Sequence, residues 1–473
     1  MAMMMRELTL GLDQDRLCRQ LSEGWRRAHH QARPVLVSAT VPTPVLDPLR
    51  WFAHGAALGP RHLFMRPSAG YALAGIGSAW TTHGRGTARF QTVGAAWRDL
   101  LDGALIDRPD TASLAGPLLL GGFAFDPLHP TTPLWQDYPP ALLSLPRYLL
   151  TCQDGACWLT VSSVVWPDTQ PDAQAEALLA PLGGLLAPAT TREDALPTHA
   201  EVTDPLPPEV WQEIVRGVAA EIRGGALEKA VLARAARVCG TAPFAPEDVL
   251  RRLRAAYPGC YIFAMSQGPS TFLGASPEQL VSLRDGQVRA MALAGSIRRG
   301  VTDQEDSALG QQLLASAKDS GEHAVVVRVL AEGLRAVCAD VRTPPAPQLL
   351  RLHNVQHLHT PITARVRAGR SVLDLVERLH PTPAVGGYPR EAALRLIRDR
   401  EGLDRGWYAG PLGWVDARGE GEFAVALRSA LLRGSEATLF AGCGIVADSQ
   451  AESEYAESAL KMRPLLAALG VLE

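Results

Sequence analysis

The sequence predicts a globular protein of the α/β or α+β class with a large mixed or antiparallel sheet. Two patterns indicate this class. The first part of the chain consists of short apolar runs separated by Gly and Pro, which is typical of strands. The second part alternates strand-like segments with segments of helical spacing. With 473 residues, 47% hydrophobic and 20% charged, the chain is long enough to bury a large core.

Composition excludes several partners. The formal net charge of −3 gives no basic footprint for nucleic acid or for an anionic membrane. No apolar run is long enough to span a bilayer, and the first sixteen residues lack the layout of a secretory signal. We therefore expect a cytoplasmic protein, in which a local basic site can still bind a small anion.

A change in composition divides the chain. We expect a strand-rich N-terminal half over residues 1–185, a linker rich in Pro, Thr, Ala and acid over 186–206, and a second half over 207–473. In the first half, Gln153-Asp154-Gly155 predicts a hairpin turn. Residues 74–77 resemble a nucleotide loop, but the third glycine of that motif is absent, so we reject this interpretation.

In the second half, periodicity predicts alternating elements. The spacing from Trp211 to Ile222 predicts a helix, residues 303–337 follow helical patterns, and 449–469 predict a last helix. Residues 229–238 and 423–432 alternate as strands do.

The seven cysteines are odd in number and scattered. Cys152 and Cys157 lie close together, but no zinc spacing appears. We expect reduced, buried thiols.

Lysine is rare, since only three of the 46 basic residues are Lys. Lys229 begins a predicted strand and shares a face with Val231 and Ala233. An apolar environment favours the neutral amine, which can act as a general base. A lysine whose ammonium reaches solvent from the strand edge is the alternative.

Acidic residues form two pairs, Asp319 with Glu322 and Glu454 with Glu457, each three apart on a predicted helix. Four carboxylates at one point suit Mg²⁺, although Glu457 and Lys461 are also spaced like an ordinary surface ion pair.

Glu278 follows Ser276-Pro277 at the end of a strand. A carboxyl there can have a raised pKa and act as a general acid, or it is simply an exposed turn residue.

Glycine-rich turns are predicted at 293–296, 386–387, 408–410 and 441–444, where backbone amides can approach ligand oxygens. Arg428, in the predicted strand 423–432, suits a bidentate pair with a carboxylate. His353, His357 and His359 have poor spacing for a metal, and we expect them to be packed or hydrogen-bonded.

Eight ordered motifs resemble the chorismate-utilising enzymes. They are LEKAVLAR (227–234), FLGASPEQL (272–280), LAGS (293–296), KDSGEH (318–323), HPTPAVGG (380–387), RGWYAGPLGW (405–414), VALRSALL (425–432) and FAGCGIVADSQAESEYAESALK (440–461). The resemblance covers residues 207–473 and, more loosely, N-terminal strands that include Gly121–Phe125.

This resemblance implies two halves of sheet and helix packed into one large domain around a central cleft. It implies Mg²⁺ bound by Glu322 and Glu457, with Asp319 and Glu454 in support. It also implies that Gly295, Ser296, Ala384, Tyr408, Arg428, Gly442 and Lys461 bind the substrate chorismate.

Three positions separate the chemistries of this family. Lys229 stands where members that use water carry their base, Ala294 stands where aminodeoxychorismate synthases have Lys, and Ala384 stands where aminating and salicylate-forming relatives commonly have Thr. The resemblance therefore implies an isochorismate synthase, an isomerase that adds water at C2 with loss of the C4 hydroxyl and needs no glutaminase subunit. Lys229 is the expected base and Glu278 the expected acid.

Motif wording favours menaquinone biosynthesis over a catechol siderophore pathway. The alternatives are a salicylate synthase, an aminating synthase and a non-catalytic chorismate-binding protein.

Overall fold

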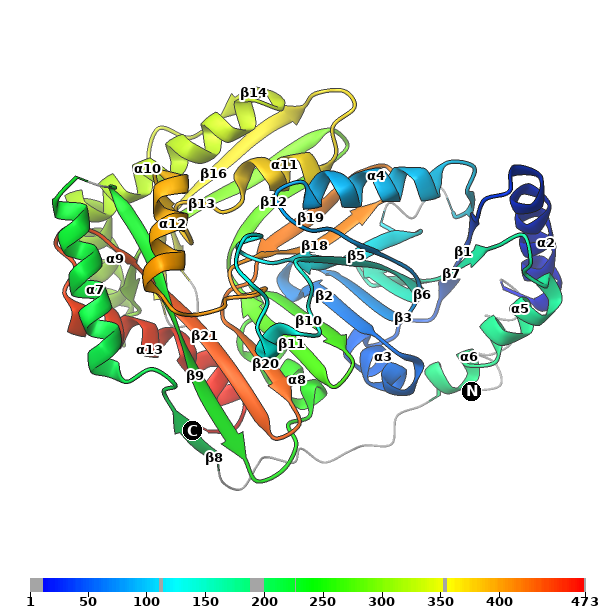
Figure 1. Cartoon of the computed structure of the whole chain (residues 1–473), viewed down its shortest axis with the longest axis horizontal. Coiled ribbons are helices and arrows are strands. Elements are labelled where there is room, and N and C mark those ends of the chain that lie inside the picture. The colour runs from blue at the N-terminus through cyan, green and yellow to red at the C-terminus, as the bar shows by residue number, and fades with distance from the viewer. Residues whose placement is uncertain (1–11, 110–113, 188–199, 226, 352–354, 472–473) are drawn as a thin grey trace.

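The computed structural model describes residues 12–109, 114–187, 200–225, 227–351 and 355–471 (Figure 1). In these segments no helix has the length and hydropathy needed to cross a membrane.

Twenty-one described strands belong to one hydrogen-bonded network. The strands are β1 (Val35–Thr43), β2 (Arg61–Arg66), β3 (Tyr71–His83), β4 (Leu105–Asp107), β5 (Leu118–Phe123), β6 (Ala141–Gln153), β7 (Ala156–Val165), β8 (Ala200–Thr203), β9 (Lys229–Gly240), β10 (Tyr261–Gln267), β11 (Ser270–Ser276), β12 (Gln279–Arg284), β13 (Gln287–Arg298), β14 (Cys338–Arg342), β15 (Gln348–Arg351), β16 (Val355–Val366), β17 (Gly387–Tyr388), β18 (Pro411–Asp416), β19 (Gly421–Val425), β20 (Ser429–Arg433) and β21 (Glu436–Ile445). All pairings are antiparallel except that of β1 with β4.

From β6 the sheet divides into two arms. The first arm runs β6-β3-β2-β10-β11-β20-β21-β9. The second arm runs β6-β5-β18-β19-β12-β13-β16. Each arm combines strands from both halves of the sequence, so the two halves share a continuous sheet.

The chain crosses between the arms twice near its centre. It passes from β11 to β12 through residues 277–278, and from β19 to β20 through residues 426–428. The two crossings are hydrogen-bonded to each other. The amide of Ala275 donates to the carbonyl of Arg428 at 3.1 Å, and the amide of Val425 donates to the carbonyl of Glu278 at 3.0 Å.

Helices cover the outer faces of the arms. They are α2 (Gln14–Gln31), α3 (Pro48–His54), α4 (Arg89–Leu101), α5 (Pro171–Leu179), α6 (Leu182–Leu185), α7 (Pro208–Arg223), α8 (Pro246–Ala256), α9 (Asp303–Ala315), α10 (Ala317–Arg335), α11 (Val372–Leu379), α12 (Arg390–Arg400) and α13 (Ala451–Ala468), with short 3-10 turns η1 (Gly55–Leu58), η2 (Pro67–Ala69) and η3 (Pro133–Trp135). Helix α10 packs on β13, and α13 packs on β21. Figure 1 shows α2 and α5 at one end of the long axis and α7 and α9 at the other.

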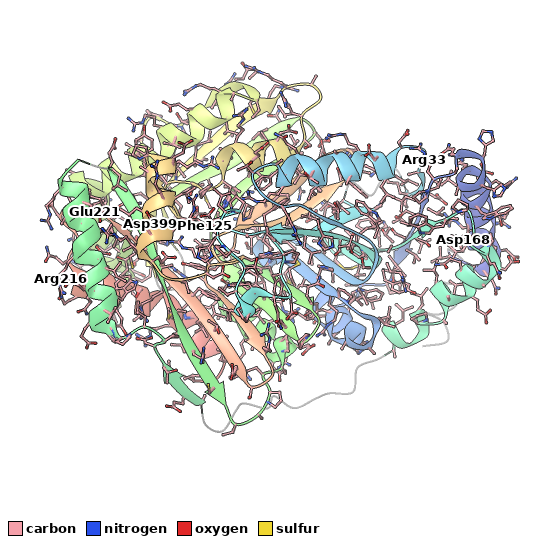
Figure 2. All side chains as sticks on the ribbon, in the orientation of Figure 1. Arg33, Phe125, Asp168, Arg216, Glu221 and Asp399 are labelled. Carbon is pink, nitrogen blue, oxygen red and sulfur yellow. A yellow bond between two sulfur atoms is a disulfide. The ribbon has the colours of Figure 1, made fainter. Side chains whose placement is uncertain are left out.

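Side chains follow this layering. Figure 2 labels Arg216 and Glu221 on α7, at one end of the molecule, and Phe125 near its centre. Phe125 is buried, and its amide donates to the carbonyl of Gly406 at 2.8 Å. The N-terminal half therefore contributes directly to the centre of the molecule.

Most predicted elements are confirmed. The mixed helix-and-strand class, the helices over 211–222, 303–337 and 449–469 and the strand from Lys229 are all present. The hairpin turn joins β6 to β7, with left-handed backbone at Asp154 (φ 50°) and Gly155 (φ 83°). Residues 74–77 lie within strand β3.

Four predictions of local structure need correction. Residues 200–203, inside the predicted linker, form β8 and pair with β9. Two predicted turns lie within strands, since 293–296 belong to β13 and 441–444 belong to β21. The predicted strand 423–432 is interrupted, because Arg428 has a left-handed backbone (φ 48°) between β19 and β20. Strand-like alternation on both sides of a crossing resembles one continuous strand.

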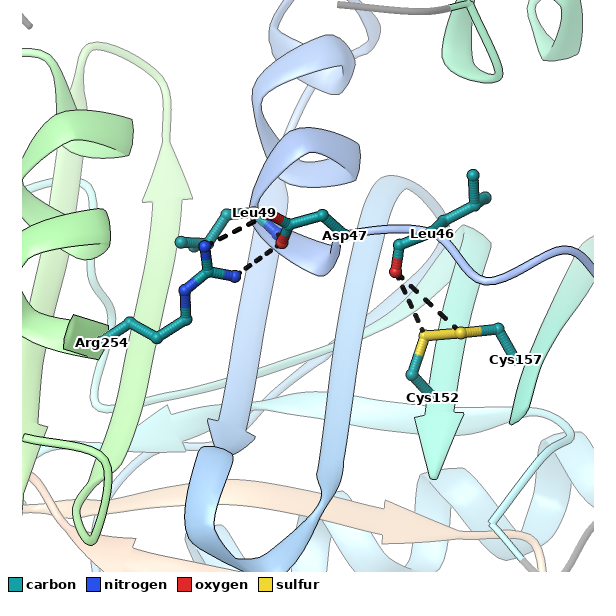
Figure 3. Close-up of a disulfide and its surroundings, with 6 residues drawn as sticks. All are labelled: Leu46, Asp47, Leu49, Cys152, Cys157 and Arg254. Atoms are coloured by element: carbon teal, nitrogen blue, oxygen red, sulfur yellow. Dashed lines mark hydrogen bonds and ion pairs between the residues drawn. A yellow bond between two sulfur atoms is a disulfide. The ribbon is translucent and has the colours of Figure 1, made fainter. Parts of the chain in front are cut away.

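The cysteine prediction is wrong at one pair, since Cys152 and Cys157 form a disulfide (Figure 3). The register of the hairpin places them directly opposite each other, with Cα atoms 4.2 Å apart. The carbonyl oxygen of Leu46 lies 3.7 Å from the sulfur of Cys152. Among the five remaining cysteines, the prediction of burial also fails for Cys18, which is partly buried, and for Cys239, which is exposed.

Candidate active site

One pocket lies where the two arms and helices α10 and α13 meet, and it encloses about 1120 Å³ of space that is partly open to solvent. All thirteen residues predicted for the site line it. They are Lys229, Glu278, Gly295, Ser296, Ala384, Tyr408, Arg428, Gly442, Lys461, Asp319, Glu322, Glu454 and Glu457. The structure thus brings together residues that are up to 232 positions apart, from Lys229 to Lys461.

Lys229 begins β9, and its side chain is buried. It shares the pocket face of the strand with Val231, as alternation predicts. Its ammonium forms a close ion pair with the carboxylate of Glu322 on α10. The side chain therefore points into the pocket and does not reach solvent.

Glu278 occupies the first crossing between the arms and is buried. Its amide donates to the hydroxyl of Ser276 at 3.2 Å, and that hydroxyl donates to the carbonyl of Val425 at 2.5 Å. Burial raises the pKa of Glu278 to about 7, although Lys229, Arg428 and Lys461 act to lower it. Near neutral pH this carboxyl can therefore hold a proton and give it up.

Arg428 occupies the second crossing and is directed into the same pocket. Burial lowers the pKa of its guanidinium below the ordinary value. No carboxylate ion pair of this side chain occurs within the described segments. A buried guanidinium without such a partner is well suited to bind a carboxylate of a ligand.

Helix α10 carries Asp319 and Glu322 in its first two turns. Ser316 caps this helix, and its hydroxyl accepts from the amide of Asp319 at 3.2 Å and donates to the carboxylate of the same residue. Local capping thus fixes the helix start that presents both acids to the pocket.

Helix α13 carries Glu454, Glu457 and Lys461. The ammonium of Lys461 lies 2.6 Å from the carboxylate of Glu457 and donates to the carbonyl of Gly442 at 2.9 Å. Burial acts to raise the pKa of Glu457, but Lys461, together with Arg428 and His357, outweighs burial and leaves the pKa below the ordinary value. Burial raises the pKa of Glu454. The expected ion pair between Glu457 and Lys461 is present, but it lines the pocket.

The donor atoms around these helices suit a hard cation. Four carboxylates from α10 and α13 line one pocket, and Mg²⁺ prefers oxygen ligands. The thiol of Cys443 lies within 4.8 Å of the carboxylates of Glu454 and Glu457. However, burial raises the pKa of this thiol to about 12, and it donates to the carbonyl of Glu454 at 3.1 Å. This thiol is thus hydrogen-bonded to a backbone carbonyl, whereas the four carboxylates supply oxygen donors, which fits magnesium.

Gly295 forms a β-bulge in β13, where the pairing with β16 shifts between Ala294 and Ser296. Its φ of +75° favours glycine, and a Cβ atom would lie 3.1 Å from the Cβ atom of Asp319. The hydroxyl of Ser296 is 2.7 Å from Nδ1 of His357. The bulge thus brings the backbone of Gly295 close to Asp319 on helix α10.

His357 and Arg405 are polar pocket residues that were not assigned a site role from the sequence. His357 is buried beside Ser296, and burial lowers its pKa to about 3, so the imidazole is neutral. It was predicted to be hydrogen-bonded, which is confirmed, but its partner lies 61 residues away. His353 lies outside the described residues.

Arg405 is the second such residue. It forms a buried ion pair with Glu401 at 2.5 Å and donates to the carbonyls of Val231 at 2.6 Å and Val385 at 2.9 Å. It therefore connects strand β9 to the loop of Ala384. Arg405 is the first residue of the motif RGWYAGPLGW. Its role was not predictable, because any residue can offer a backbone carbonyl and the sequence therefore does not show which carbonyls an arginine contacts.

Tyr408 closes the pocket. Its ring stacks on Phe440 with centroids 5.4 Å apart, and burial raises the pKa of its phenol to about 12. The phenol remains a neutral hydrogen-bond donor at physiological pH.

The fold and this pocket define a chorismate-binding enzyme. The chain belongs to the chorismate binding enzyme family, whose model matches residues 22–470. It is 36% identical over 455 residues to the isochorismate synthase MenF of Bacillus subtilis, covering 94% of this chain and 96% of that protein. It is 41% identical over 461 residues to the salicylate biosynthesis isochorismate synthase of Pseudomonas aeruginosa, covering 93% and 92%.

A solved structure agrees with these relatives. The menaquinone-specific isochorismate synthase MenF of Escherichia coli superposes with a TM-score of 0.78 at 26% identity, over 95% of this chain and 100% of that chain. The two-armed architecture is therefore the fold of the chorismate-binding enzymes.

Proposed function

We propose that the protein is an isochorismate synthase that converts chorismate to isochorismate. The observation that carries this proposal is the presence of Lys229 and Glu278 in one pocket, with the pKa of Glu278 raised to about 7. A cleft that holds an amine and a carboxyl whose pKa is raised by burial is typical of general acid–base catalysis. The names of two relatives that match along nearly their whole length support the same activity.

In this proposal Lys229 acts as the neutral amine, after its ammonium has lost a proton, and accepts a proton from water, and the resulting hydroxide bonds to ring carbon 2. The ring double bonds shift, and the bond from carbon 4 to its hydroxyl breaks. Glu278 donates a proton to that hydroxyl, which leaves as water. One water enters and one leaves, so the product is an isomer of the substrate.

The remaining residues bind the substrate. Arg428 and Lys461 provide positive charge for its carboxylates, and the phenol of Tyr408 provides a neutral donor. Glu322 and Glu457 would hold Mg²⁺, with Asp319 and Glu454 in support. When bound, the ion would supply positive charge next to a substrate carboxylate.

The test is to incubate the purified protein with chorismate and Mg²⁺, without ammonia, and to separate the products by chromatography with mass detection. We expect isochorismate, its loss on chelation with EDTA, and a fall in turnover of about 10²- to 10⁴-fold in Lys229→Ala and in Glu278→Gln. Wild-type turnover in either variant would refute the assigned roles. Ammonia-dependent turnover would indicate an aminating enzyme instead.

Two pathways fit the relatives. The name of the Escherichia coli protein, a menaquinone-specific MenF, favours menaquinone biosynthesis, and the Bacillus subtilis protein is also named MenF. The name of the Pseudomonas aeruginosa protein favours salicylate formation. We propose the menaquinone role. Growth of a menaquinone-requiring strain that lacks its own isochorismate synthase is expected on expression of this chain. Release of pyruvate and salicylate in the assay would point to the alternative, in which the enzyme also cleaves isochorismate.

A further inference from the structure

Gly444 lies on β21 beside the side chain of Lys229. In the pairing of β21 with β9, Gly444 is opposite Val231 and Gly442 is opposite Ala233. Both glycines line the pocket together with Lys229. Residue 229 is thus the diagonal neighbour of residue 444 on the same face of the sheet, at a distance that long side chains can bridge.

A side chain at position 444 would collide with Lys229. The three atoms nearest to a Cβ atom built on Gly444 are Cε of Lys229 at 2.7 Å, Nζ of Lys229 at 3.1 Å and Oε1 of Glu322 at 3.4 Å. At Gly442, in contrast, the nearest atom is the backbone carbonyl oxygen of Leu232, at 2.9 Å. Replacing Gly444 therefore displaces a flexible side chain, whereas replacing Gly442 strains the sheet itself.

The backbone conformation at position 444 does not require a glycine. Gly444 has no positive φ, unlike Gly295, so its conformation is open to any residue. The absent Cβ atom is the property that matters, because it leaves space for the lysine stem to lie across β21.

We propose that Gly444 is a positioning residue for Lys229, because it leaves free the space beside β21 in which the lysine stem lies and so directs Nζ into the pocket. The kinetic part rests on the proposed function, in which Lys229 is the base. A methyl group at 444 moves Nζ and leaves the fold intact, since every close contact is with the end of a side chain. Misplacement of a catalytic group by about 1 Å costs on the order of a hundredfold in rate.

The first experiment measures the position of Lys229 without any reaction. The chain has three lysines, Lys229, Lys318 and Lys461, so protein labelled with ε-¹³C-lysine gives three assignable signals. Lys229→Ala identifies one signal directly, and Lys318→Arg and Lys461→Arg identify it by elimination.

In Gly444→Ala we expect the Lys229 signal to shift and the Lys318 signal to stay in place. The matched control is Gly217→Ala, an exposed helical glycine on α7 with no atom within 4 Å of an added Cβ, which should move none of the three. An unmoved Lys229 signal in Gly444→Ala would overturn the proposal, whether or not the protein makes isochorismate.

The second experiment is kinetic. In Gly444→Ala we expect kcat to fall about a hundredfold with little change in KM for chorismate, and Gly217→Ala should match the wild type. In a Lys229→Ala background the same Gly444→Ala change should cause no further loss, because the displaced side chain is gone. An equal further loss in that background would show that Gly444 acts through the structure in general, and it would overturn the proposal.

Discussion

Burial and the charge of Lys229 act in opposite directions on Glu278, and burial prevails. Both residues line one pocket. Among the positively charged side chains that lower the pKa of Glu278, Lys229 has the largest effect. Because the pKa still lies at about 7, roughly half of the molecules carry a protonated Glu278 at neutral pH.

If Glu278 is the general acid, turnover requires its protonated form. We expect kcat/KM for chorismate to fall as the pH rises through about 7, where the free enzyme loses this proton. Glu278→Gln should lower turnover about 10²- to 10⁴-fold and remove this limb of the profile. A pH–rate profile of both proteins checks this, and persistence of the limb in Glu278→Gln would assign it to another group.

Glu278 also makes folding depend on pH. Its pKa rises from the ordinary 4.5 to about 7 on folding, so the unfolded chain releases the proton first. Stability should therefore fall between pH 4.5 and pH 7 and then level off. Glu278→Gln removes this loss, and we expect it to stabilise the protein by at most about 3 kcal/mol above pH 7.

Urea unfolding of the substrate-free protein at pH 8 and at pH 4.5 measures this effect. The gain of Glu278→Gln should be present at pH 8 and nearly absent at pH 4.5. An equal gain at both values would mean that packing, and not ionisation, is responsible.

Local patterns made much of this site predictable. Asp319 with Glu322 and Glu454 with Glu457 are three apart on helices, and helical spacing is visible in a single segment. Lys229 was predictable from strand alternation. The resemblance of the ordered motifs to a known family then indicated that these segments form one site. Periodicity cannot indicate this, because it describes one segment at a time.

The errors share one physical origin, which is pairing between distant segments. Arg428 turns because the chain changes arms there, and alternation on its two sides continues undisturbed. The contact of His357 with Ser296 depends on the register of β16 against β13. Residues 200–203 form a strand because β9 offers an edge, although their composition is typical of a linker.

The two carboxylates proposed to bind Mg²⁺ each form an ion pair with a lysine. Glu322 pairs with Lys229, and Glu457 pairs with Lys461. A cation that binds Glu322 must compete with the ammonium of Lys229, so Lys229→Gln should tighten Mg²⁺ binding by about tenfold or more, equivalent to about 1.4 kcal/mol.

Titration calorimetry of the substrate-free protein with Mg²⁺ tests this competition. The matched variant is Lys318→Gln, which removes a pocket lysine with no ion pair among the described contacts. It should tighten binding much less. Equal effects of the two variants would show a general influence of charge, without displacement of a specific ammonium.

Helix α13 is anchored on its other side by Asp204. This carboxylate accepts from the phenol of Tyr455 on α13 and from Arg234 on β9, the latter at 2.8 Å. Arg234 also donates to the hydroxyl of Ser458 at 2.6 Å and lies over the ring of Tyr455, 4.1 Å from its centroid. Asp204 therefore links the region expected to be a linker to the helix that carries Glu454 and Glu457.

Tyr455→Phe removes one hydrogen bond to this charged group and keeps the ring. We expect a loss of about 1.5–3 kcal/mol in the free energy of unfolding, together with weaker Mg²⁺ binding, because α13 is held less firmly. Denaturant unfolding and calorimetry measure the two effects. Tyr388→Phe, whose phenol has no hydrogen bond among those described, is the matched control and should change neither.

The disulfide of the N-terminal half should stabilise the fold without serving the reaction. Cys152 and Cys157 close a short hairpin, and neither lines the pocket. Nearby, Asp47 caps α3 through the amide of Leu49 at 2.9 Å and pairs with Arg254 at 2.7 Å, so this region joins the two halves (Figure 3).

A closed loop of this size contributes about 2 kcal/mol through the entropy of the unfolded chain. The double variant Cys152→Ser/Cys157→Ser should lose about that much stability and keep the kcat of the wild type. Thiol titration of the denatured, unreduced wild type should find five thiols, and seven after reduction. If seven react before reduction, the pair is a dithiol, and the double variant should then lose little stability because no covalent constraint on the unfolded chain is removed.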